Sequence, residues 1–445
     1  MNKSFHIITF GCQMNEHDSE RIAGILEKQG CHSSACEDAD IIVLNTCSIR
    51  EKAEQKFYSE LGRIKKYKIA KPELIIVAAG CIAQQEGKAI LSRAPYVDVI
   101  IGTSDLEKLP ELIEKRFDSC KPAFDVSGDP DYHIKRLPAL RNDGIKAWVS
   151  IMYGCNNFCS YCVVPYVRGR ERSRPSDDIV NEVRQLAEKG YKEVTLLGQN
   201  VNSYGNGCES PVNFPSLLKL LNNETDITRI RFVTSHPRDL SEELISAIRD
   251  LSKVCESLHL PVQSGSNTIL HAMNRRYSRE EYLDKVSRLR QEVPGITLST
   301  DIIVGFPGET EKDFLQTMKL LEEVHFDSIF AFKYSQRPQT AACKYQDDVE
   351  QQIKEKRLHE VLALQKNITF EQNKRQIGTV QEVLVDGQSK KGVRLSGRTR
   401  GNKVVNFEAP SELIGNLVHV SITKAGMNSL TGDLIIKEPI KTDEH

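Results

Sequence analysis

The chain has 445 residues, of which 27% are charged and 39% hydrophobic, and its formal net charge is -1. This composition predicts a globular protein of about three domains and excludes a chain that attracts nucleic acid through its overall charge. No run approaches about 18 apolar residues, and the apolar stretch at 5–10 is too short for a signal peptide, so we expect a cytoplasmic protein without a membrane span.

Strand and helix signals alternate over the first domain, to which we assign residues 3–118. Apolar runs at 5–10, 41–44, 74–79 and 97–101 are typical of strands. Helical patterns cover 17–29, a segment rich in Lys and Glu after the second strand, and 84–93. This alternation predicts an α/β domain with a parallel sheet covered by helices.

Three cysteines of this domain, Cys12, Cys47 and Cys81, each come directly after a predicted strand. In a parallel sheet those positions converge at the edge where α/β sheets bind ligands. Cys31 and Cys36 follow a helix and precede a strand, so we expect them at the opposite edge. The first three are therefore a candidate ligand set, and the alternative is that they are ordinary buried thiols.

A second domain, residues 146–373, follows a segment at 119–145 whose prolines and glycine predict a linker. Strands are expected at 148–153, 193–197, 229–233, 257–260, 297–304 and 328–334, with helices between them and a long charged helix at 349–374. Six such strand–helix units predict a partial or full β/α barrel.

Capping residues mark several helix starts in this domain. Ser176 is predicted to cap a helix that begins at the next residue. Ser278 with Glu281, and Thr310 with Asp313, have the spacing of a capping box, in which side chain and backbone bond reciprocally.

Cys155, Cys159 and Cys162 form a CxxxCxxC pattern directly after the first strand of the predicted barrel. That placement puts them at the carboxyl mouth, where barrel active sites lie. Three thiolates within eight residues suit an iron–sulfur cluster and leave one of four irons open to a small molecule. The alternative is structural zinc, which prefers four ligands, and no fourth Cys or His follows within about thirty residues.

Four arginines alternate after this cysteine loop: Arg168, Arg170, Arg172 and Arg174. In an extended segment alternate side chains point to one side, so the row predicts a track for phosphates beside the active-site mouth. The alternative is a charged loop in solvent.

The last domain, residues 374–440, changes to short β-rich runs at 380–385, 392–396, 403–407, 417–422 and 433–436, a pattern that predicts a small antiparallel β-barrel. Between 374 and 403 eight Lys or Arg residues face two acidic ones. Three of them, Arg398, Arg400 and Lys403, lie together, so we expect an RNA-binding module; the alternative is an ordinary solvated barrel face.

The CxxxCxxC spacing, with Tyr161 before its last cysteine and a β/α barrel after it, resembles the radical S-adenosylmethionine superfamily. The resemblance implies that the open iron binds the methionine part of the cofactor and that its reductive cleavage gives a 5′-deoxyadenosyl radical. Later strand ends would bind the cofactor, which singles out Gln199, Asn200 and Gln263 beside Tyr161. The usual Gly-Gly-Glu motif is not intact at 198–200.

Further motifs resemble the MiaB group of methylthiotransferases over nearly the whole chain: GCQMN at 11–15, NTCSIR at 45–50, GC at 80–81, PYVRGRERSRP at 165–175 and LGQNVNSY at 197–204. The stretch GRTRGNK at 397–403 resembles a TRAM domain. One departure is Gln339, where the group's pattern has glycine, and we expect it to alter only a local turn.

This resemblance implies a radical reaction on tRNA that adds a methylthio group to carbon 2 of N6-isopentenyladenosine next to the anticodon. Cys12, Cys47 and Cys81 would hold an auxiliary [4Fe–4S] cluster that carries the sulfur, and Cys155, Cys159 and Cys162 would hold the cluster that cleaves S-adenosylmethionine. The implied partners are tRNA, an electron donor protein, and proteins for Fe–S assembly or sulfur donation.

Two other functions are considered. A sister enzyme of the same family would modify threonylcarbamoyl-adenosine in tRNA or an aspartate of a ribosomal protein; the segments at 13–15 and 170–172 favour the isopentenyl substrate. A more distant alternative is a non-catalytic Fe–S sensor that binds RNA through its C-terminal barrel, and a complete cofactor-type cluster motif argues against it.

Overall fold

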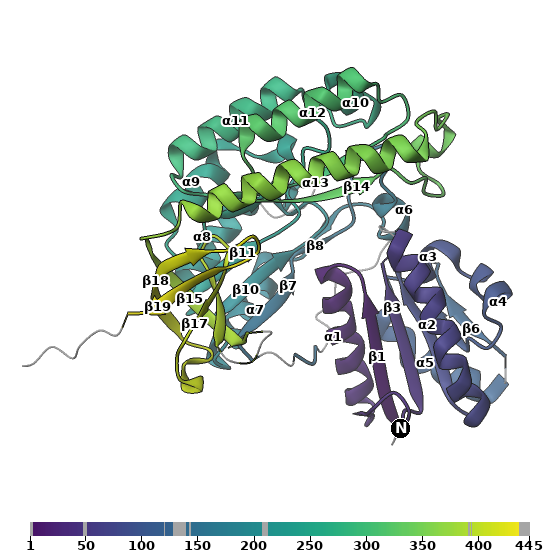
Figure 1. Ribbon diagram of the computed structural model, residues 1–445. Helices are drawn as coiled ribbons and strands as arrows, with labels where there is room; N and C mark the ends of the chain where they lie inside the picture. The colour runs from purple at the N-terminus through teal and green to yellow at the C-terminus, as the bar shows by residue number, and fades with distance from the viewer. Residues whose placement is uncertain are drawn as a thin grey trace, which may run out of the picture.

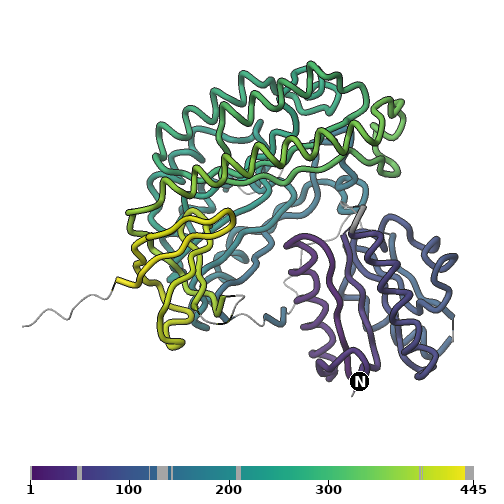
Figure 2. The backbone as a smooth tube through the Cα atoms, in the orientation of Figure 1, coloured from purple at the N-terminus to yellow at the C-terminus, as the bar shows by residue number. Residues whose placement is uncertain are grey.

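The computed structural model describes residues 3–47, 51–119, 121–127, 139–141, 144–206, 212–389, 392 and 394–435. Outside the described residues lie part of one motif (48–50), the middle of the expected linker (128–138) and the expected end of the last domain (436–440). Figures 1 and 2 show the N-terminal α/β domain and the C-terminal β-barrel at different sides of a larger central domain.

The N-terminal domain is built on a six-stranded sheet in the order β2-β1-β3-β4-β5-β6, with every pairing parallel. Its strands are β1 (Ser4–Phe10), β2 (His32–Ser33), β3 (Ile41–Thr46), β4 (Ile75–Gly80), β5 (Val99–Ile101) and β6 (Ala123–Asp125). The central strands β3 and β4 are buried along their whole length because helices cover both faces. The edge strand β6 lies within the segment that the sequence predicted as a linker.

The helices of this domain are α1 (Gln13–Lys28), α2 (Glu51–Ala70), α3 (Cys81–Glu86), α4 (Ala89–Arg93), the 3-10 turn η1 (Leu106–Lys108) and α5 (Leu109–Ser119). Apolar residues of α1 and α5 form the core on one face of the sheet, and those of α2, α3 and α4 form the core on the other. Two predictions differ from the structure: α1 begins four residues before 17, and the helix expected at 84–93 is broken at Gly87, which has a φ of +51°.

The central domain is a partial β/α barrel, as predicted. Two three-stranded parallel sheets, in the orders β7-β10-β11 and β12-β13-β14, are joined by a parallel bridge between Ile230 and Val254. The strands are β7 (Lys146–Ser150), β10 (Glu193–Leu197), β11 (Arg229–Phe232), β12 (Ser257–His259), β13 (Thr297–Val304) and β14 (Ser328–Lys333); a short antiparallel pair, β8 (Met152–Tyr153) and β9 (Arg172–Ser173), lies at the mouth.

Helices cover the outside of this barrel, and the long helix α13 runs along it in Figure 1. They are α7 (Ser176–Glu188), α8 (Phe214–Glu224), α9 (Glu242–Asp250), α10 (Asn267–Ala272), α11 (Arg279–Glu292), α12 (Glu311–Val324) and α13 (Gln351–Lys374), with 3-10 turns η2 (Val201–Ser203), η3 (Pro237–Asp239) and η4 (Ala341–Lys344). The short helix α6 (Val164–Val167) follows the cysteine loop and packs on the N-terminal domain instead. Both predicted capping boxes are confirmed at α11 and α12. The predicted cap at Ser176 is wrong, because Pro175 holds the N-cap position and no side chain bonds there.

The C-terminal domain is a closed barrel in the order β15-β16-β17-β19-β18. Its strands are β15 (Val380–Gln388), β16 (Leu395–Thr399), β17 (Val404–Phe407), β18 (Leu417–Ala425) and β19 (Leu430–Leu434), with the 3-10 turn η5 (Ser411–Leu413). All pairings are antiparallel except the short one between β17 and β19. Closure removes free strand edges, which is how so short a chain forms a stable sheet.

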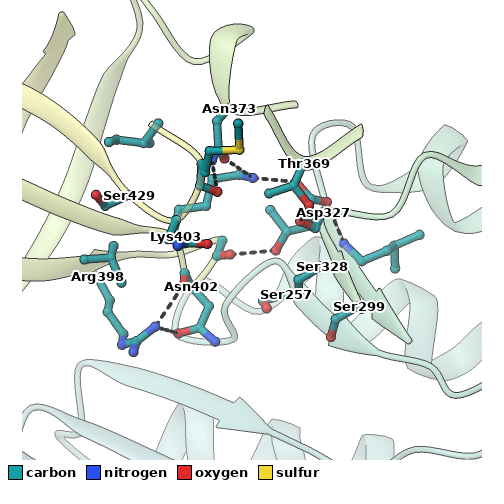
Figure 3. Close-up of a pocket in the computed structure, with 17 residues that line it drawn as sticks. Ser257, Ser299, Asp327, Ser328, Thr369, Asn373, Arg398, Asn402, Lys403 and Ser429 are labelled. Carbon is teal, nitrogen blue, oxygen red and sulfur yellow. Dashed lines mark hydrogen bonds and ion pairs between the residues drawn. The ribbon is translucent and has the colours of Figure 1, made fainter. Parts of the chain in front are cut away.

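The C-terminal barrel docks against the amino ends of the central strands, away from the cysteine loop. Arg229, at the start of β11, is fully buried and pairs with Glu382 of β15 at 2.7 Å. Arg231 donates to the carbonyl oxygens of Thr399 and Arg400, each at 2.7 Å. A polar cavity of about 230 Å³ remains at this junction, and Figure 3 shows Arg398 and Lys403 at its rim. In the part of the chain that the structure describes, no helix is long and apolar enough to cross a membrane.

Candidate active site and metal centres

The structure brings the N-terminal cysteines together at the carboxyl ends of three adjacent strands. Cys12 follows β1 as the N-cap of α1, Cys47 follows β3, and Cys81 is the first residue of α3 after β4. The thiol of Cys47 hydrogen-bonds with both other thiols. A Cβ added at Gly11 would lie 2.6 Å from the Cβ of Cys47, so glycine is required for this approach.

Hydrogen bonding to Cys47 lowers the pKa of Cys12 to about 6 and that of Cys81 to about 7. Burial opposes both shifts, and the positive charge of Arg168 favours both thiolates. The pKa of the shared partner Cys47 is raised in compensation. Thiolate rather than thiol is the metal ligand, so this site is partly prepared for iron.

Two asparagines that the sequence analysis did not single out hold this edge of the sheet. The Asn45 side chain donates to the backbone oxygen of Asn15 at 2.8 Å, and the Asn15 side chain returns a bond of 3.3 Å to it. Asn15 also accepts from the Cys12 thiol at 3.4 Å. These bonds fix α1 and β3 relative to each other. Asn15 lies in the motif at 11–15 and Asn45 in the motif at 45–50, so these motifs could have pointed to both residues.

The second set, Cys155, Cys159 and Cys162, lies in the loop after β8. Gly154 starts the loop with a φ of +76°, and a Cβ there would lie 2.0 Å from the Arg170 backbone oxygen. Cys159 accepts from the buried guanidinium of Arg275 at 3.4 Å. Arg275 was not found from the sequence, because it follows α10, far along the chain, in a segment without a motif.

Burial raises the thiol pKa values of this set, to about 11 for Cys155 and about 12 for Cys162. Neighbouring cysteines push both values in the same direction. A metal that binds here must displace protons from thiols that hold them tightly, so metal and proton compete more strongly at this loop than at the sheet edge.

Each set offers three soft sulfur donors, the ligands that iron–sulfur clusters use. Among the described residues, no three His, Cys, Asp or Glu side chains close around one metal ion. A [4Fe–4S] cluster does not require that, because each thiolate bonds a different iron of a larger unit. In each set three soft sulfur donors at neighbouring positions leave one iron for another ligand.

Unpartnered polar atoms gather where β10 and β11 end. Gln199 accepts from the backbone N–H of Gly154 at 2.5 Å, while its own Nε2 is buried without a hydrogen-bond partner among the described residues. Asn200 donates to Asp239 at 2.7 Å, and neither its Oδ1 nor the Nε2 of His236 has a hydrogen-bond partner in the part of the chain that the structure describes. Buried polar atoms in this state are expected where a polar ligand binds.

Gln263 and Tyr161 lie on the other side of the mouth. Gln263 has a φ of +76°, and its backbone bonds to Asp301 and Ile303 across β13. Tyr161 packs with the apolar cluster that includes Ile269. Burial raises its pKa, and it lies within electrostatic reach of the cysteines beside it.

The segment that follows the second cysteine set packs on the first set, across the junction of the N-terminal and central domains. Cys81 packs against Val163, the N-cap of α6, and Val167 at its end, and this segment follows the second set directly. Thr103 donates to the Val167 backbone oxygen at 2.6 Å. Arg168, the next residue, pairs with Asp18 of α1 at 2.8 Å. The loop that carries one cysteine set is therefore bonded to the domain that carries the other.

The sequence predicted that the four arginines at 168–174 form one row on the surface, and this prediction is wrong. Arg168 and Arg174 are each 5% exposed and pair with Asp18 and Glu182. Arg170 is exposed and lies over the Phe158 ring, 4.4 Å from its centroid, and Arg172 is half-buried in β9. Acidic partners draw two of the four inward: Asp18 on the distant α1, and Glu182 on α7, the helix that follows.

The basic residues of the C-terminal barrel are also divided. Arg400 pairs with Glu256 at 2.7 Å, and Lys403 pairs with Asp327 at 2.6 Å, so both bond the barrel to the central domain. Arg398 lies 3.8 Å from the Asp386 carboxylate and donates to Asn402 at 3.2 Å (Figure 3), yet 40% of its side chain stays exposed.

Three family patterns match this chain in order. Residues 4–102 match the uncharacterized protein family UPF0004, residues 149–321 match the radical SAM superfamily, and residues 374–435 match the TRAM domain. Both cysteine sets lie within the first two matches.

Proteins called tRNA-2-methylthio-N(6)-dimethylallyladenosine synthase are similar over nearly the full length. Those of Carboxydothermus hydrogenoformans and Thermodesulfovibrio yellowstonii are 49% and 50% identical, and each comparison covers 97% of this chain and 99% of the relative. That of Acetivibrio thermocellus is 50% identical over 97% of this chain and 91% of its own length.

Among solved structures, the radical S-adenosylmethionine methyltransferase TsrM from Kitasatospora setae, with tryptophan and a cofactor analogue bound, has a TM-score of 0.56. It covers 86% of this chain and 79% of that one at 13% identity. The cobalamin-dependent radical enzyme OxsB gives 0.51 at 14% identity, covering 82% and 56%. At such identities the likeness concerns the fold.

Proposed function

The chain belongs to the family of tRNA-2-methylthio-N(6)-dimethylallyladenosine synthases, and from that premise we propose that it adds a methylthio group to carbon 2 of N6-isopentenyladenosine next to the anticodon of tRNA. The observation that carries the proposal is that α6, which directly follows one three-cysteine set, packs on Cys81 of the other set across a domain junction. A reaction that joins a sulfur group to an unreactive carbon needs both functions within reach of one base.

As a member of the radical SAM superfamily, the chain uses S-adenosylmethionine and a [4Fe–4S] cluster. We assign that cluster to Cys155, Cys159 and Cys162. When bound, the pair supplies the one-electron chemistry that activates the base. Gln199 and Asn200 offer a donor and an acceptor to the polar part of S-adenosylmethionine, because their free amide atoms are buried at the strand ends. Tyr161 and Gln263 would complete this site.

A second [4Fe–4S] cluster on Cys12, Cys47 and Cys81 is the finer part of the proposal. It is supported by the donor set and by the lowered pKa values of Cys12 and Cys81. This cluster would supply the sulfur. The contacts of α6 with Cys81 and of Arg168 with Asp18 would hold the two sites in a fixed position relative to each other.

Contacts with tRNA are proposed for the exposed or half-buried basic side chains. Arg170 and Arg172 lie beside the cysteine loop, and Arg398 projects from the C-terminal barrel. Phosphate contacts of this kind would position the RNA without reading its sequence. Arg168, Arg174, Arg400 and Lys403 would support these surfaces from within, since each is more buried than Arg398 and pairs with a carboxylate.

The reaction requires electrons and a renewed supply of sulfur, so we also propose two kinds of protein partner: an electron donor, and proteins for Fe–S assembly or sulfur donation. A cytoplasmic location follows from the tRNA substrate. Each of these is open to pull-down and fractionation experiments with the full-length protein.

The test of function is mass spectrometry of tRNA nucleosides from a strain that lacks this gene. We expect the methylthio form of N6-isopentenyladenosine to disappear and the unmodified precursor to accumulate, and both should be restored by the wild-type gene but not by a variant with Cys155, Cys159 and Cys162 changed to Ala. Normal methylthio-isopentenyladenosine together with loss of a methylthio group from threonylcarbamoyl-adenosine would assign the chain to the sister activity.

A further inference from the structure

Arg168 occupies an unusual position between the two cysteine sets. It follows α6, the helix that packs on Cys81, and its side chain is 5% exposed. One guanidinium nitrogen, Nη2, donates to Asp18 on α1 at 2.8 Å. Arg168 thus belongs by sequence to the loop of the second cysteine set and by contact to the domain of the first.

The other nitrogen, Nη1, is buried and has no hydrogen-bond partner among the described residues. A buried guanidinium N–H without a partner is costly, since it has lost water and gained nothing. Val167, the residue before Arg168, packs on Cys81, and Asp18, to which Arg168 donates, lies on the helix whose N-cap is Cys12. Arg168 therefore lies beside the N-terminal cysteines with an unused donor.

Resting on the proposed second cluster, we propose that Arg168 is a positioning residue of that cluster, donating a hydrogen bond from Nη1 to one of its sulfur atoms. The bond would add a fourth contact to a site with three protein thiolates, and it would come from the domain that carries the other cysteine set. Hydrogen bonds to sulfur and nearby positive charge both stabilise the reduced, more negative form of such a cluster, so its reduction potential should depend on Arg168.

A purely structural role is the alternative, because the same side chain also joins two domains. Asp18 separates the two possibilities. Its carboxylate pairs with Arg168 and lies 3.7 Å from Arg21, so replacing it also weakens the junction. For a group that only holds the domains together, the Arg168 and Asp18 variants should behave alike. For a group that acts on the cluster by charge and hydrogen bonding, they should shift the potential in opposite directions.

The experiment uses the full-length chain with Cys155, Cys159 and Cys162 changed to Ala, reconstituted with iron and sulfide without oxygen, so that only the N-terminal set can hold a cluster. A redox titration followed by electron paramagnetic resonance gives the potential. We expect Arg168→Gln to lower the reduction constant at least tenfold, a shift of 59 mV to more negative potential for one electron. Arg168→Lys, which keeps the charge, should recover much of the shift, and Asp18→Asn should move the potential to more positive values.

Arg184→Gln is the matched control, because this arginine of α7 is exposed and bonds only surface partners. It should leave the potential unchanged. If the cluster forms with about four irons but its potential is the same in all variants, or shifts in one direction for both Arg168→Gln and Asp18→Asn, the inference is overturned. If no cluster forms in the parent chain, the proposed second cluster fails instead, and the two failures are distinguishable.

Discussion

The two cysteine sets each contain three thiols, but the backbone structures that hold them differ. Cys12, Cys47 and Cys81 come from three strands of one sheet and share hydrogen bonds. The other three lie within eight residues of a single loop, held by Gly154 and Arg275. The first set has two thiols with lowered pKa values, whereas burial raises the pKa of Cys155 and Cys162.

This contrast shows that the surroundings of a cysteine site set the protonation of its thiols before a metal binds. At the sheet edge, a shared thiol and a buried guanidinium favour thiolates before any metal arrives. In the loop, Arg275 donates to one sulfur, and burial raises the pKa of the other two thiols, so a metal that binds there must displace their protons. The two sites should therefore differ in reactivity as apoprotein and in role as holoprotein, and each prediction below tests one side of that difference.

The largest expected effect is a division of labour. Changing Cys12, Cys47 and Cys81 to Ala should abolish methylthio transfer to tRNA while the formation of 5′-deoxyadenosine from S-adenosylmethionine continues, because the loop set is intact. Changing Cys155, Cys159 and Cys162 should abolish both. Liquid chromatography of nucleosides and deoxyadenosine measures the two products in one reaction. If the variant that lacks Cys12, Cys47 and Cys81 still makes methylthiolated tRNA over several turnovers, the two sets do not have separate roles.

The second prediction concerns the apoprotein. Cys12 and Cys162 are both partly exposed, and their pKa values are about 6 and about 12. At pH 7.5 the lowered pKa makes Cys12 a thiolate, whereas Cys162 stays a thiol, so iodoacetamide should label Cys12 at least about tenfold faster even after its weaker nucleophilicity is considered.

Peptide mass spectrometry of protein labelled for short times without oxygen measures both rates in one sample. Lowering the pH to 5, below the pKa of Cys12, should slow labelling of that residue because the thiol becomes protonated. Cys343, exposed and outside both sets, serves as the internal reference. Equal rates for Cys12 and Cys162 across this range would remove the electrostatic contrast.

A smaller effect is expected at the RNA surfaces that flank the sites. Arg398→Ala should weaken tRNA binding about fivefold, roughly 1 kcal/mol, and reduce its salt slope by about one contact, because an exposed phosphate contact is lost. Arg170→Ala, nearer the chemistry, should lower product yield even at saturating tRNA. Filter binding across a salt series, run beside turnover assays, separates affinity from positioning; an unchanged slope for Arg398→Ala would contradict the assignment of that residue.

The smallest effect is expected at a turn of the central domain that lies outside both cysteine sets, next to a contact with the N-terminal domain. Gln339 has a φ of +68° in the turn after β14, beside Arg337, which lies 3.5 Å from Glu54 of the N-terminal domain. Gln339→Gly should relieve the left-handed strain and stabilise the fold by about 0.5–1 kcal/mol after the entropy of glycine is subtracted. Calorimetry should show a slightly higher melting temperature with unchanged iron content; a lower one would contradict this reading.

Much of this architecture was predictable because its signals are local. Apolar runs located the central strands β10 and β13 to the residue, and the capping boxes at Ser278 and Thr310 located two helix starts. The convergence of Cys12, Cys47 and Cys81 followed from the rule for parallel strands alone. Even the departure at Gln339 marked a real turn, since the backbone there has the conformation that favours glycine.

What could not be predicted depends on partners far apart in the sequence. The arginines at 168 and 174 have the spacing of an exposed row, yet Asp18, 150 residues away, turns Arg168 inward. Arg400 and Lys403 likewise face acidic residues at the strand starts of another domain. The three-residue edge strand β6 has too few residues for a periodic pattern, so it was expected to be linker.

The most direct test of the two-site account is an iron and sulfide count, with Mössbauer spectra, on wild-type protein and the two triple-alanine variants after anaerobic reconstitution. Because each of the two sites would hold four irons, we expect about eight irons per wild-type chain and about four in each variant, all as [4Fe–4S] clusters. Four irons in the wild type with none left after loss of Cys155, Cys159 and Cys162, or zinc in place of iron, would contradict it.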